Sequence, residues 1–283
     1  MTEMIYASAV LLASIQPLWR RQSVSQVNVS GISMDENSAS VLLSLLDRAV
    51  LKCVGDAEYV DVAFSGGLDS SLIAVLAKKH AKVKGYSIGM KESHDAQWCA
   101  HAASLIGIDH IFIPLTREEV ISCANEFLDY FKVDSFLMLS YELPVYILLK
   151  KCGGKVILSG QGADELFAGY KRYLNVGVER LNDILKKDYE KAKNERLMEI
   201  EIAAGMGKVI CYPFMEKEVE DFAFSLPAHK KINNGERKVM LRVCARIAGV
   251  PEEICNKEKK AIQYSTGIYK VLVQNWKTRG FYS

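Results

Sequence analysis

The sequence lacks an excess of charge of either sign, and it lacks closely paired cysteines. Its 36 lysine and arginine residues are almost balanced by 34 aspartate and glutamate residues, so the formal net charge is +2. This balance does not predict a nucleic-acid or membrane surface. The seven cysteines are scattered, with no Cys-x-x-Cys pair. Their spacing argues against a zinc site and a disulfide framework, and it favours free thiols in a reducing, cytoplasmic setting.

The sequence also lacks a long apolar run. The segment from Met4 to Trp19 is mostly apolar, but it is too short to span a bilayer. Glu3 precedes it at the place where a signal peptide carries positive charge. We therefore expect no targeting segment and no membrane association. Residues 1–40 are interpreted as an N-terminal extension that packs on the core or on a partner subunit, and a homodimer is left open.

The remaining residues, 41–283, are expected to form one domain, because 283 residues suffice for a single large core. From about Asp61 onward, strand-like and helix-like patterns alternate. The expected strands are Val60–Phe64, Val83–Ile88, His110–Leu115 and Lys155–Leu158. The expected helices between or after them are Ser70–Lys79, His94–Ile106, Arg117–Phe131 and Leu143–Lys151. This alternation predicts an α/β fold with a doubly wound parallel sheet.

After about Gly169 the strand pattern fades, and a helical subregion is expected from about residue 175. The expected helices there are Val178–Lys187, Tyr189–Ala204, Lys217–Ala223, Glu236–Ala248 and Ile268–Lys277. Ligands of doubly wound sheets bind beyond the carboxyl ends of the strands. Two glycine-containing loops occur at such strand ends, and both are therefore candidates for the binding site.

The first loop reads Ser65-Gly66-Gly67-Leu68-Asp69-Ser70-Ser71 and joins a strand to a helix. Its glycines allow the backbone to approach a polyphosphate closely, its serines add hydroxyl donors, and the helix offers its positive N-terminus. Asp69 would repel phosphates unless Mg²⁺ lies between them. No Gly-Lys-Ser/Thr follows, so this is not a Walker A loop. The alternative is a simple turn in which Ser or Asp caps the helix.

These residues resemble the loop of the pyrophosphate-loop ATPases, a superfamily that includes asparagine synthetase, NAD synthetase and tRNA thiolases. The resemblance implies an adenine-nucleotide hydrolase-like fold and cleavage of ATP between the α- and β-phosphates. By position in this fold, Ala63 and Ile88 are expected to line the adenine. The first loop alone does not choose among the members of the superfamily.

The second loop reads Ser159-Gly160-Gln161-Gly162-Ala163-Asp164-Glu165-Leu166-Phe167-Ala168-Gly169-Tyr170. It is similar to the Ser-Gly-Glu-Gly-Ser-Asp-Glu-x-Phe-Gly-Gly-Tyr signature of asparagine synthetase. Asp164 can supply a second carboxylate to metal-bound pyrophosphate. The alternative is an ordinary strand-to-helix turn whose acidic residues favour the helix N-terminus.

Two later segments resemble asparagine synthetase more loosely. The run Asn234-Gly235-Glu236-Arg237-Lys238-Val239-Met240-Leu241-Arg242 resembles the family's Gly-x-x-Lys-x-x-Leu-Arg helix. The run from Lys257 to Gly267 resembles a late Arg-x-Lys loop that supplies a lysine to the phosphates and the transition state. The spacing differs by about one residue, so either Lys259 or Lys260 could take that role. The alternative for this basic run is a solvated surface.

The sequence departs from the family where the acceptor and the amine are handled. Thr2 stands where the family's glutaminase domain has its nucleophilic cysteine, so we expect no glutamine hydrolysis. Gln161 replaces an acidic residue and cannot take a proton. The family's Arg-Ala-Ser-Thr-Pro reads Ser140-Tyr141-Glu142-Leu143-Pro144, and its Arg-x-Pro-Phe-Leu-Asp reads Cys211-Tyr212-Pro213-Phe214-Met215-Glu216. Glu142 or Glu165 could compensate as a base, and Lys151 or Arg172 could pair with the acceptor.

The resemblance implies an ATP-dependent, AMP-forming amide ligase with ATP and Mg²⁺ as cofactors. The expected metal ligands are Asp69 and Asp164, and Gln161 belongs to the catalytic loop together with these residues and Lys259 or Lys260. The expected phosphate-binding residues are Ser65, Gly66, Gly67, Ser70, Ser71 and Gly160. The expected partners are a small carboxylate such as aspartate and an amine or ammonia, the latter from a separate glutaminase.

Two other functions remain open at this point. A tRNA-modifying ATPase would show a basic face and usually catalytic cysteines, and the near-neutral charge and absent Cys-x-x-Cys pair count against it. A nucleotide-binding regulatory protein with a decayed acceptor site would bind ATP without releasing pyrophosphate.

Overall fold

The computed structural model describes residues 34–90, 95–133, 135–257 and 266–278. The chain divides into two units, Met1–Ile32 and Ser33–Ser283, and the described residues all belong to the second. Most of the predicted extension, residues 1–40, therefore lies outside the described residues, and its boundary with the synthetase domain stays a prediction. Among the described helices, none combines the length and the apolar character needed to cross a bilayer.

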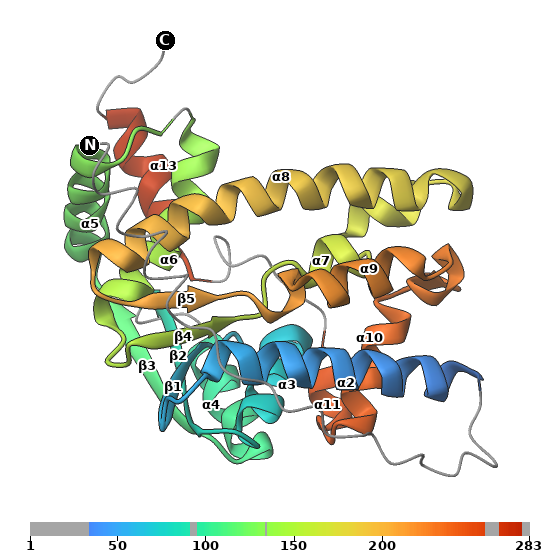
Figure 1. Cartoon of the computed structure of the whole chain (residues 1–283). Helices are drawn as coiled ribbons and strands as arrows, with labels where there is room; N and C mark the ends of the chain where they lie inside the picture. Colours follow the sequence, from blue (N-terminus) through green and yellow to red (C-terminus); the bar gives the residue numbers. More distant parts are fainter. Residues whose placement is uncertain (1–33, 91–94, 134, 258–265, 279–283) are drawn as a thin grey trace, which may run out of the picture. The chain divides into compact units, whose positions relative to one another are not determined.

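A five-stranded parallel sheet forms the centre of the described unit, in the order β3-β2-β1-β4-β5 (Figure 1). Its strands are β1 (Tyr59–Ala63), β2 (Lys82–Met90), β3 (Asp109–Leu115), β4 (Val156–Ser159) and β5 (Val209–Cys211). The chain adds β2 and β3 on one side of β1 and then returns to add β4 on the other side. The switch point of the sheet therefore lies between β1 and β4, where doubly wound folds bind their ligands. The predicted fold class is confirmed.

Helices cover both faces of the sheet. In chain order they are α2 (Met34–Val54), α3 (Leu68–Ala77), α4 (Asp95–Ile106), α5 (Arg117–Tyr130), α6 (Phe136–Lys151), α7 (Ala163–Leu166), α8 (Val178–Gly205), α9 (Lys217–Ser225), α10 (Val239–Ile247), α11 (Glu252–Cys255) and α13 (Ile268–Thr278), with 3₁₀ turns η1 (Lys171–Asn175), η2 (Pro213–Met215) and η3 (Ala228–Lys230). Helices α2, α3, α4 and α10 share one hydrophobic core, whereas α5, α6 and α13 share the other with part of α8.

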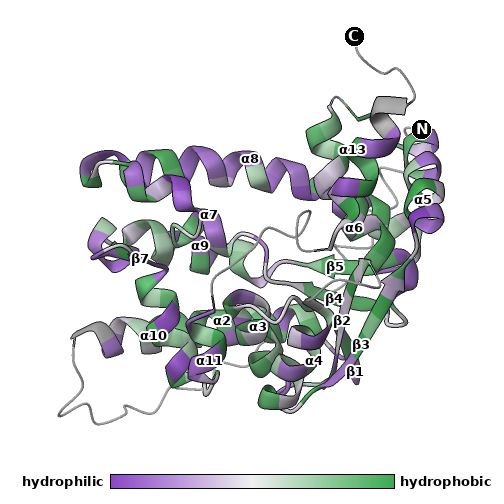
Figure 2. Ribbon diagram, turned by 180° about the vertical axis from the view of Figure 1, so that it is seen from behind, coloured by the Kyte–Doolittle hydropathy of each residue, from purple (hydrophilic) through white to green (hydrophobic). Residues whose placement is uncertain are grey.

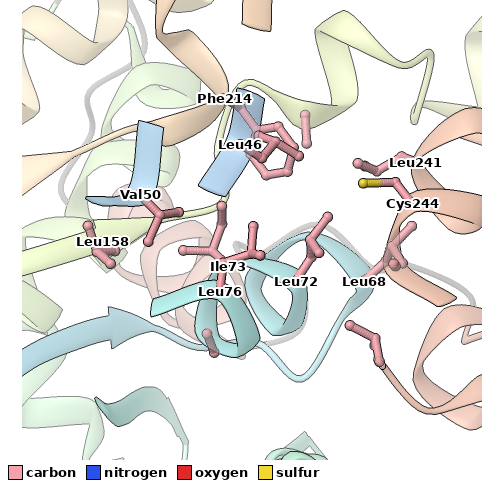
Figure 3. Packing of buried hydrophobic residues seen from close by; sticks show 14 of the residues in the cluster. Leu46, Val50, Leu68, Leu72, Ile73, Leu76, Leu158, Phe214, Leu241 and Cys244 are labelled. Carbon is pink, nitrogen blue, oxygen red and sulfur yellow. The ribbon is translucent and has the colours of Figure 1, made fainter. Parts of the chain in front are cut away.

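Side-chain alternation along the strands divides the two cores. Ile157 and Leu158 are neighbours on β4, and both are fully buried, but they belong to opposite cores, as the two-residue period of a strand requires. Helix α3 is buried nearly all round because it packs among α2, α10 and the sheet. Figure 3 shows Leu72 and Leu76 of α3 among side chains of these elements. Full burial of each such leucine contributes about 1.5–3 kcal/mol, so the helix that follows the first loop is firmly held.

The structure differs from the sequence prediction in the helical half of the chain. The helices expected at Val178–Lys187 and Tyr189–Ala204 are one continuous helix, α8, which is largely hydrophilic along its length (Figure 2). The helix expected from Glu236 begins only at Val239, because Glu236–Arg237 forms strand β7 and pairs with β6 (Ile232–Asn233). Helix α2 and the short strand β5 were not predicted.

Candidate active site

The first loop lies between β1 and α3, at the switch point of the sheet. Gly67 occupies the N-cap of α3 and provides no side-chain cap, so the first-turn amides remain directed at the space where an anion would bind. The hydroxyl groups of Ser65 and Ser70 lie 3.1 Å apart, and Ser70 also donates to the carbonyl oxygen of Gly67. Ser71 is fully buried, and its hydroxyl has no hydrogen-bond partner among the described residues.

Trp98 on α4 holds the middle of the first loop. Its indole Nε1 donates to the carbonyl oxygen of Gly66 at 2.8 Å. Gly66 has a φ of 64°, and a Cβ there would lie 2.8 Å from the same indole nitrogen, so glycine is required for both backbone conformation and space. The Lys257 ammonium lies 3.4 Å from the centroid of the Trp98 ring, a cation–π contact.

The second loop follows β4 and touches the first loop. Ala63 and Ser159 are paired residues at the ends of β1 and β4, so both loops leave the sheet at the same edge. A Cβ on Gly160 would lie 3.0 Å from the backbone of Asp69, which shows how closely the loops approach. Asp164 lies in the first turn of the short helix α7 and is buried.

The side chains of the two loops meet at Lys238. Its Nζ lies 2.6 Å and 2.7 Å from the two carboxylate oxygens of Asp69 and 2.7 Å from Oδ1 of Asp164. The three side chains are each 10% exposed or less. Without Lys238, two buried carboxylates would face each other at this point, so the ammonium offsets a repulsion that the low-dielectric interior would make severe.

The backbone around Lys238 is shaped to deliver its side chain. Lys238 is the N-cap of α10, directly after the β6–β7 ladder, and it has a φ of 58°. A non-glycine residue in this region costs free energy and commonly marks a functional site. Arg237 donates to the carbonyl oxygen of Gly169, while Arg242 donates to the carbonyl oxygens of Arg237 and Cys255. The arginine of the late helical motif therefore has a structural role.

Sequence reasoning quoted the motif that contains Lys238 but did not assign this residue to the site. The signal was its position in the Gly-x-x-Lys-x-x-Leu-Arg motif, which the helical interpretation of the whole run concealed. Two other candidates, Lys259 and Lys260, lie outside the described residues, and their role stays a prediction. Ala63 ends β1 directly before the first loop, and Ile88 is buried on β2.

A second group of charged side chains is buried behind the second loop. Glu142 on α6 and Arg196 and Glu199 on α8 are each less than 10% exposed. The Arg196 Nε lies 3.0 Å from Glu199 Oε1, and its NH2 group lies 3.6 Å from Glu142 Oε1. Tyr212 donates its hydroxyl to Glu199 Oε2. Burial raises the pKa of both Glu142 and Glu199, and the neighbouring Arg196 opposes that rise. We call these four residues the buried acidic network.

The other residues considered for the acceptor side are engaged in local contacts. Ser140, at the position of the family's arginine, is buried and donates to the carbonyl oxygen of Leu137 within its own helix. Glu165 accepts a hydrogen bond from the Tyr170 hydroxyl at 2.6 Å. The two cations pair with exposed or half-buried carboxylates: Lys151 with Glu119 at 3.2 Å and Arg172 with Asp188 at 3.0 Å.

The donor set of the two loops fits a divalent cation. Asp69 and Asp164 converge on a single cationic group, the Lys238 ammonium, so this position favours positive charge. The described residues contain no group of three or more His, Cys, Asp or Glu side chains arranged to hold a metal. Two carboxylates still suit Mg²⁺, which keeps water and phosphate oxygens in most of its coordination sites.

The chain matches the sequence model of the asparagine synthase family over residues 41–206 and 202–277. It is 30% identical over 298 aligned positions to a protein of Methanocaldococcus jannaschii described as a glutamine-hydrolyzing asparagine synthetase, covering 88% of this chain and 54% of that protein. It is 25% identical to asparagine synthetase B of Escherichia coli, covering 80% of this chain and 44% of the relative. The chain therefore spans about half the length of these curated relatives.

Among solved structures, the NMN synthetase of Francisella tularensis resembles the chain with a TM-score of 0.42, 11% identity and 89% coverage of both chains. This similarity is too low to carry a functional argument. The family match covers most of the chain and includes both loops and the Lys238 segment. The chain belongs to the asparagine synthase family.

Proposed function

We propose that this chain is an AMP-forming amide ligase that activates a carboxylate with ATP. The observation that carries the proposal is the convergence of Asp69 and Asp164 on Lys238 at the switch point of the sheet. A loop for phosphates and a second acidic loop in direct contact suit a substrate that has both a polyphosphate and a divalent cation.

In the proposed reaction, a carboxylate oxygen of the acceptor attacks the α-phosphorus of ATP. The bond between the α-phosphorus and the bridging oxygen breaks, and pyrophosphate leaves. The lone pair of an amine then attacks the acyl carbon, the bond from that carbon to the AMP oxygen breaks, and the proton released by the amine leaves with AMP or water. The products are an amide, AMP and pyrophosphate.

The residues divide these tasks by position. The α3 amides and the hydroxyls of Ser65 and Ser70 would bind the phosphates, while Ala63 and Ile88 would line the adenine. Asp69 and Asp164 would hold Mg²⁺, which when bound would shield the charge of the leaving pyrophosphate. Lys238 would keep the two carboxylates together, and Lys259 or Lys260 would neutralise charge that develops on the phosphates.

The acceptor and nitrogen donor are proposed at the level of chemical class. The acceptor is a small carboxylic acid, and the nitrogen comes as ammonia or an amine, including ammonia supplied by a separate glutaminase. We expect asparagine formation from aspartate and ammonia to be slow, because Gln161 and the inward-turned Ser140 replace charged residues of the family pattern. Loss of a charged partner typically costs about a hundredfold in rate.

A screen of small carboxylic acids with ATP, Mg²⁺ and ammonium chloride tests the proposal. AMP and pyrophosphate should appear in equal amounts with at least one acid, and the same acid should support exchange of labelled pyrophosphate into ATP. Release of ADP and phosphate would contradict the proposed reaction. ATP binding without pyrophosphate exchange under any acid would instead favour a regulatory nucleotide-binding protein.

A further inference from the structure

We propose that Gln161 binds the incoming amine through its side-chain carbonyl oxygen, and that Glu199 is the positioning residue that sets this orientation. The inference rests on the proposed function, because it assigns the amine subsite of the same reaction. It gives a role to the residue that replaces the family's acidic group in the second loop.

Gln161 stands where an amine must arrive. It follows Ser159 and Gly160 at the end of β4 and precedes Asp164 of the same loop by three residues. Its Oε1 atom is buried and has no hydrogen-bond partner among the described residues. A buried acceptor without a donor is unfavourable, so a ligand that brings an N–H or O–H group to this oxygen would remove the penalty.

The orientation of the Gln161 amide follows from its other contact. The Gln161 side chain hydrogen-bonds to the Glu199 carboxylate, which already receives the Tyr212 hydroxyl and lies 3.0 Å from the Arg196 Nε. A carboxylate surrounded by donors acts as an acceptor, so the Gln161 amide nitrogen must face it. The carbonyl oxygen then points away from Glu199, as a fixed and unused acceptor.

The buried acidic network makes this orientation rigid. Arg196 lies between Glu142 and Glu199 and is also 3.8 Å from Glu195, so three carboxyl groups share one guanidinium. Both oxygens of Glu142 lack a hydrogen-bond partner among the described residues. Burial raises the pKa of Glu142, which favours its neutral form and leaves Arg196 to Glu199. The network thereby keeps Glu199 available to hold Gln161.

The chemistry of Gln161 differs from that of a carboxylate at the same place. An amide oxygen accepts a hydrogen bond but takes no proton at neutral pH, so Gln161 can orient an uncharged amine without acting as its base. The fitting ligands are ammonia, hydroxylamine and small primary amines. Because the amine keeps its N–H bond to Gln161 while its lone pair attacks the acyl carbon, the stoichiometry of the ligase reaction is unchanged.

The test compares hydroxamate formation at increasing hydroxylamine concentration in five proteins, with an acid that supports pyrophosphate exchange in the wild type. These are the wild type, Gln161→Ala, Glu199→Gln, the double variant Gln161→Glu/Glu199→Gln, and Gln97→Ala as a matched control. Gln97 is an exposed glutamine on α4, remote from the second loop in sequence. Pyrophosphate exchange is measured in parallel, and thermal unfolding verifies that each variant is folded.

The hydroxylamine KM should rise about three- to tenfold in Gln161→Ala, the usual effect of one lost hydrogen bond. Higher hydroxylamine should recover product formation, while the KM for ATP changes far less. The double variant exchanges donor and acceptor, so it should recover most of the amine KM that Glu199→Gln loses. Gln97→Ala should match the wild type.

Two results would overturn the inference, and they are distinguishable. If exchange persists in Gln161→Ala but its hydroxylamine KM equals that of the wild type, Gln161 does not bind the amine. If the double variant is worse than Glu199→Gln alone, the two side chains are not a donor–acceptor pair. A wild type that exchanges pyrophosphate with no acid would overturn the proposed function itself, and the inference with it.

Discussion

The indole nitrogen of Trp98 donates a hydrogen bond of 2.8 Å to the carbonyl oxygen of Gly66, in the centre of the first loop. The same ring carries the Lys257 ammonium on its face, 3.4 Å from its centroid. Trp98 is therefore the link between the phosphate-binding loop and the start of the late lysine-rich segment. Its environment should change when a polyphosphate occupies the loop.

Trp98→Phe should weaken ATP binding about three- to tenfold, because it removes one hydrogen bond that fixes the loop while keeping most of the ring. In the wild type, ATP with Mg²⁺ should change the tryptophan fluorescence, and this change should disappear in Trp98→Phe. Trp276→Phe serves as the control and should retain the signal. An ATP-dependent signal that survives in Trp98→Phe would show that this indole does not report on the loop.

Asp69→Asn should abolish pyrophosphate release while the protein stays folded. The substitution removes a charge from the proposed metal site and almost no volume, and Lys238 keeps its second partner, Asp164, at 2.7 Å. Pyrophosphate release and the melting temperature are measured together. Full activity would refute the metal assignment, whereas a severe loss of melting temperature would make Asp69 a mainly structural residue.

Lys238→Met should destabilise the protein by about 3–5 kcal/mol, because it leaves two buried carboxylates without their cation. Adding Asp69→Asn and Asp164→Asn to Lys238→Met should recover a large part of this loss, since the three side chains are then uncharged. Urea unfolding of the single and triple variants measures the difference. Equal stabilities would mean that the cluster does not behave as one electrostatic unit.

Gly169→Ala should disrupt the site by sterics alone. A Cβ at this position would lie 1.9 Å from Asp164 Oδ1 and 2.3 Å from Lys238 Cε, so the ion pair must move. We expect a loss of about 1–3 kcal/mol in unfolding free energy and loss of pyrophosphate release. Gly205→Ala at the end of α8 meets no atom within 4 Å and should leave both measurements unchanged. A functional Gly169→Ala would show that the loop adapts.

Lys231 should make stability depend on pH. It is fully buried, with its Nζ 2.9 Å from Asn182 Oδ1, and burial lowers the pKa of Lys231 to about 7. In the unfolded chain a lysine keeps its proton up to about pH 10.4, so between these values the unfolded state binds more protons. Stability contributed by this group therefore rises as the pH increases above 7 and is constant below it.

Lys231→Met should remove this dependence. The unfolding free energy of the wild type should rise by about 1 kcal/mol per pH unit relative to Lys231→Met between pH 7 and 8.5. The exposed Lys155→Met serves as the control and should follow the wild type. Parallel curves for wild type and Lys231→Met would show that the buried amine keeps an ordinary pKa.

Much of the fold could be predicted from local patterns. The strands at the centre of the sheet and the helices that follow them were expected within a few residues of their observed bounds, because alternation and apolar runs are local properties. Helix α8 was divided at Asp188, although this side chain accepts hydrogen bonds from Arg172 and Tyr173 rather than ending the helix. Strand β5 is only three residues long, and it gains its pairing from β4 rather than from its own sequence.

The sequence by itself determined the two loops, their glycines and the carboxylates Asp69 and Asp164, since the order of residues after a strand specifies which side chains reach the end of the sheet. Only the tertiary structure decided that Lys238, 169 residues after Asp69, supplies their cation. It also decided that Glu199 holds Gln161. Both depend on long-range packing and on an unusual backbone conformation at Lys238. Local propensity carries no information about which distant side chain an interior charge will meet, because burial creates the need for that partner.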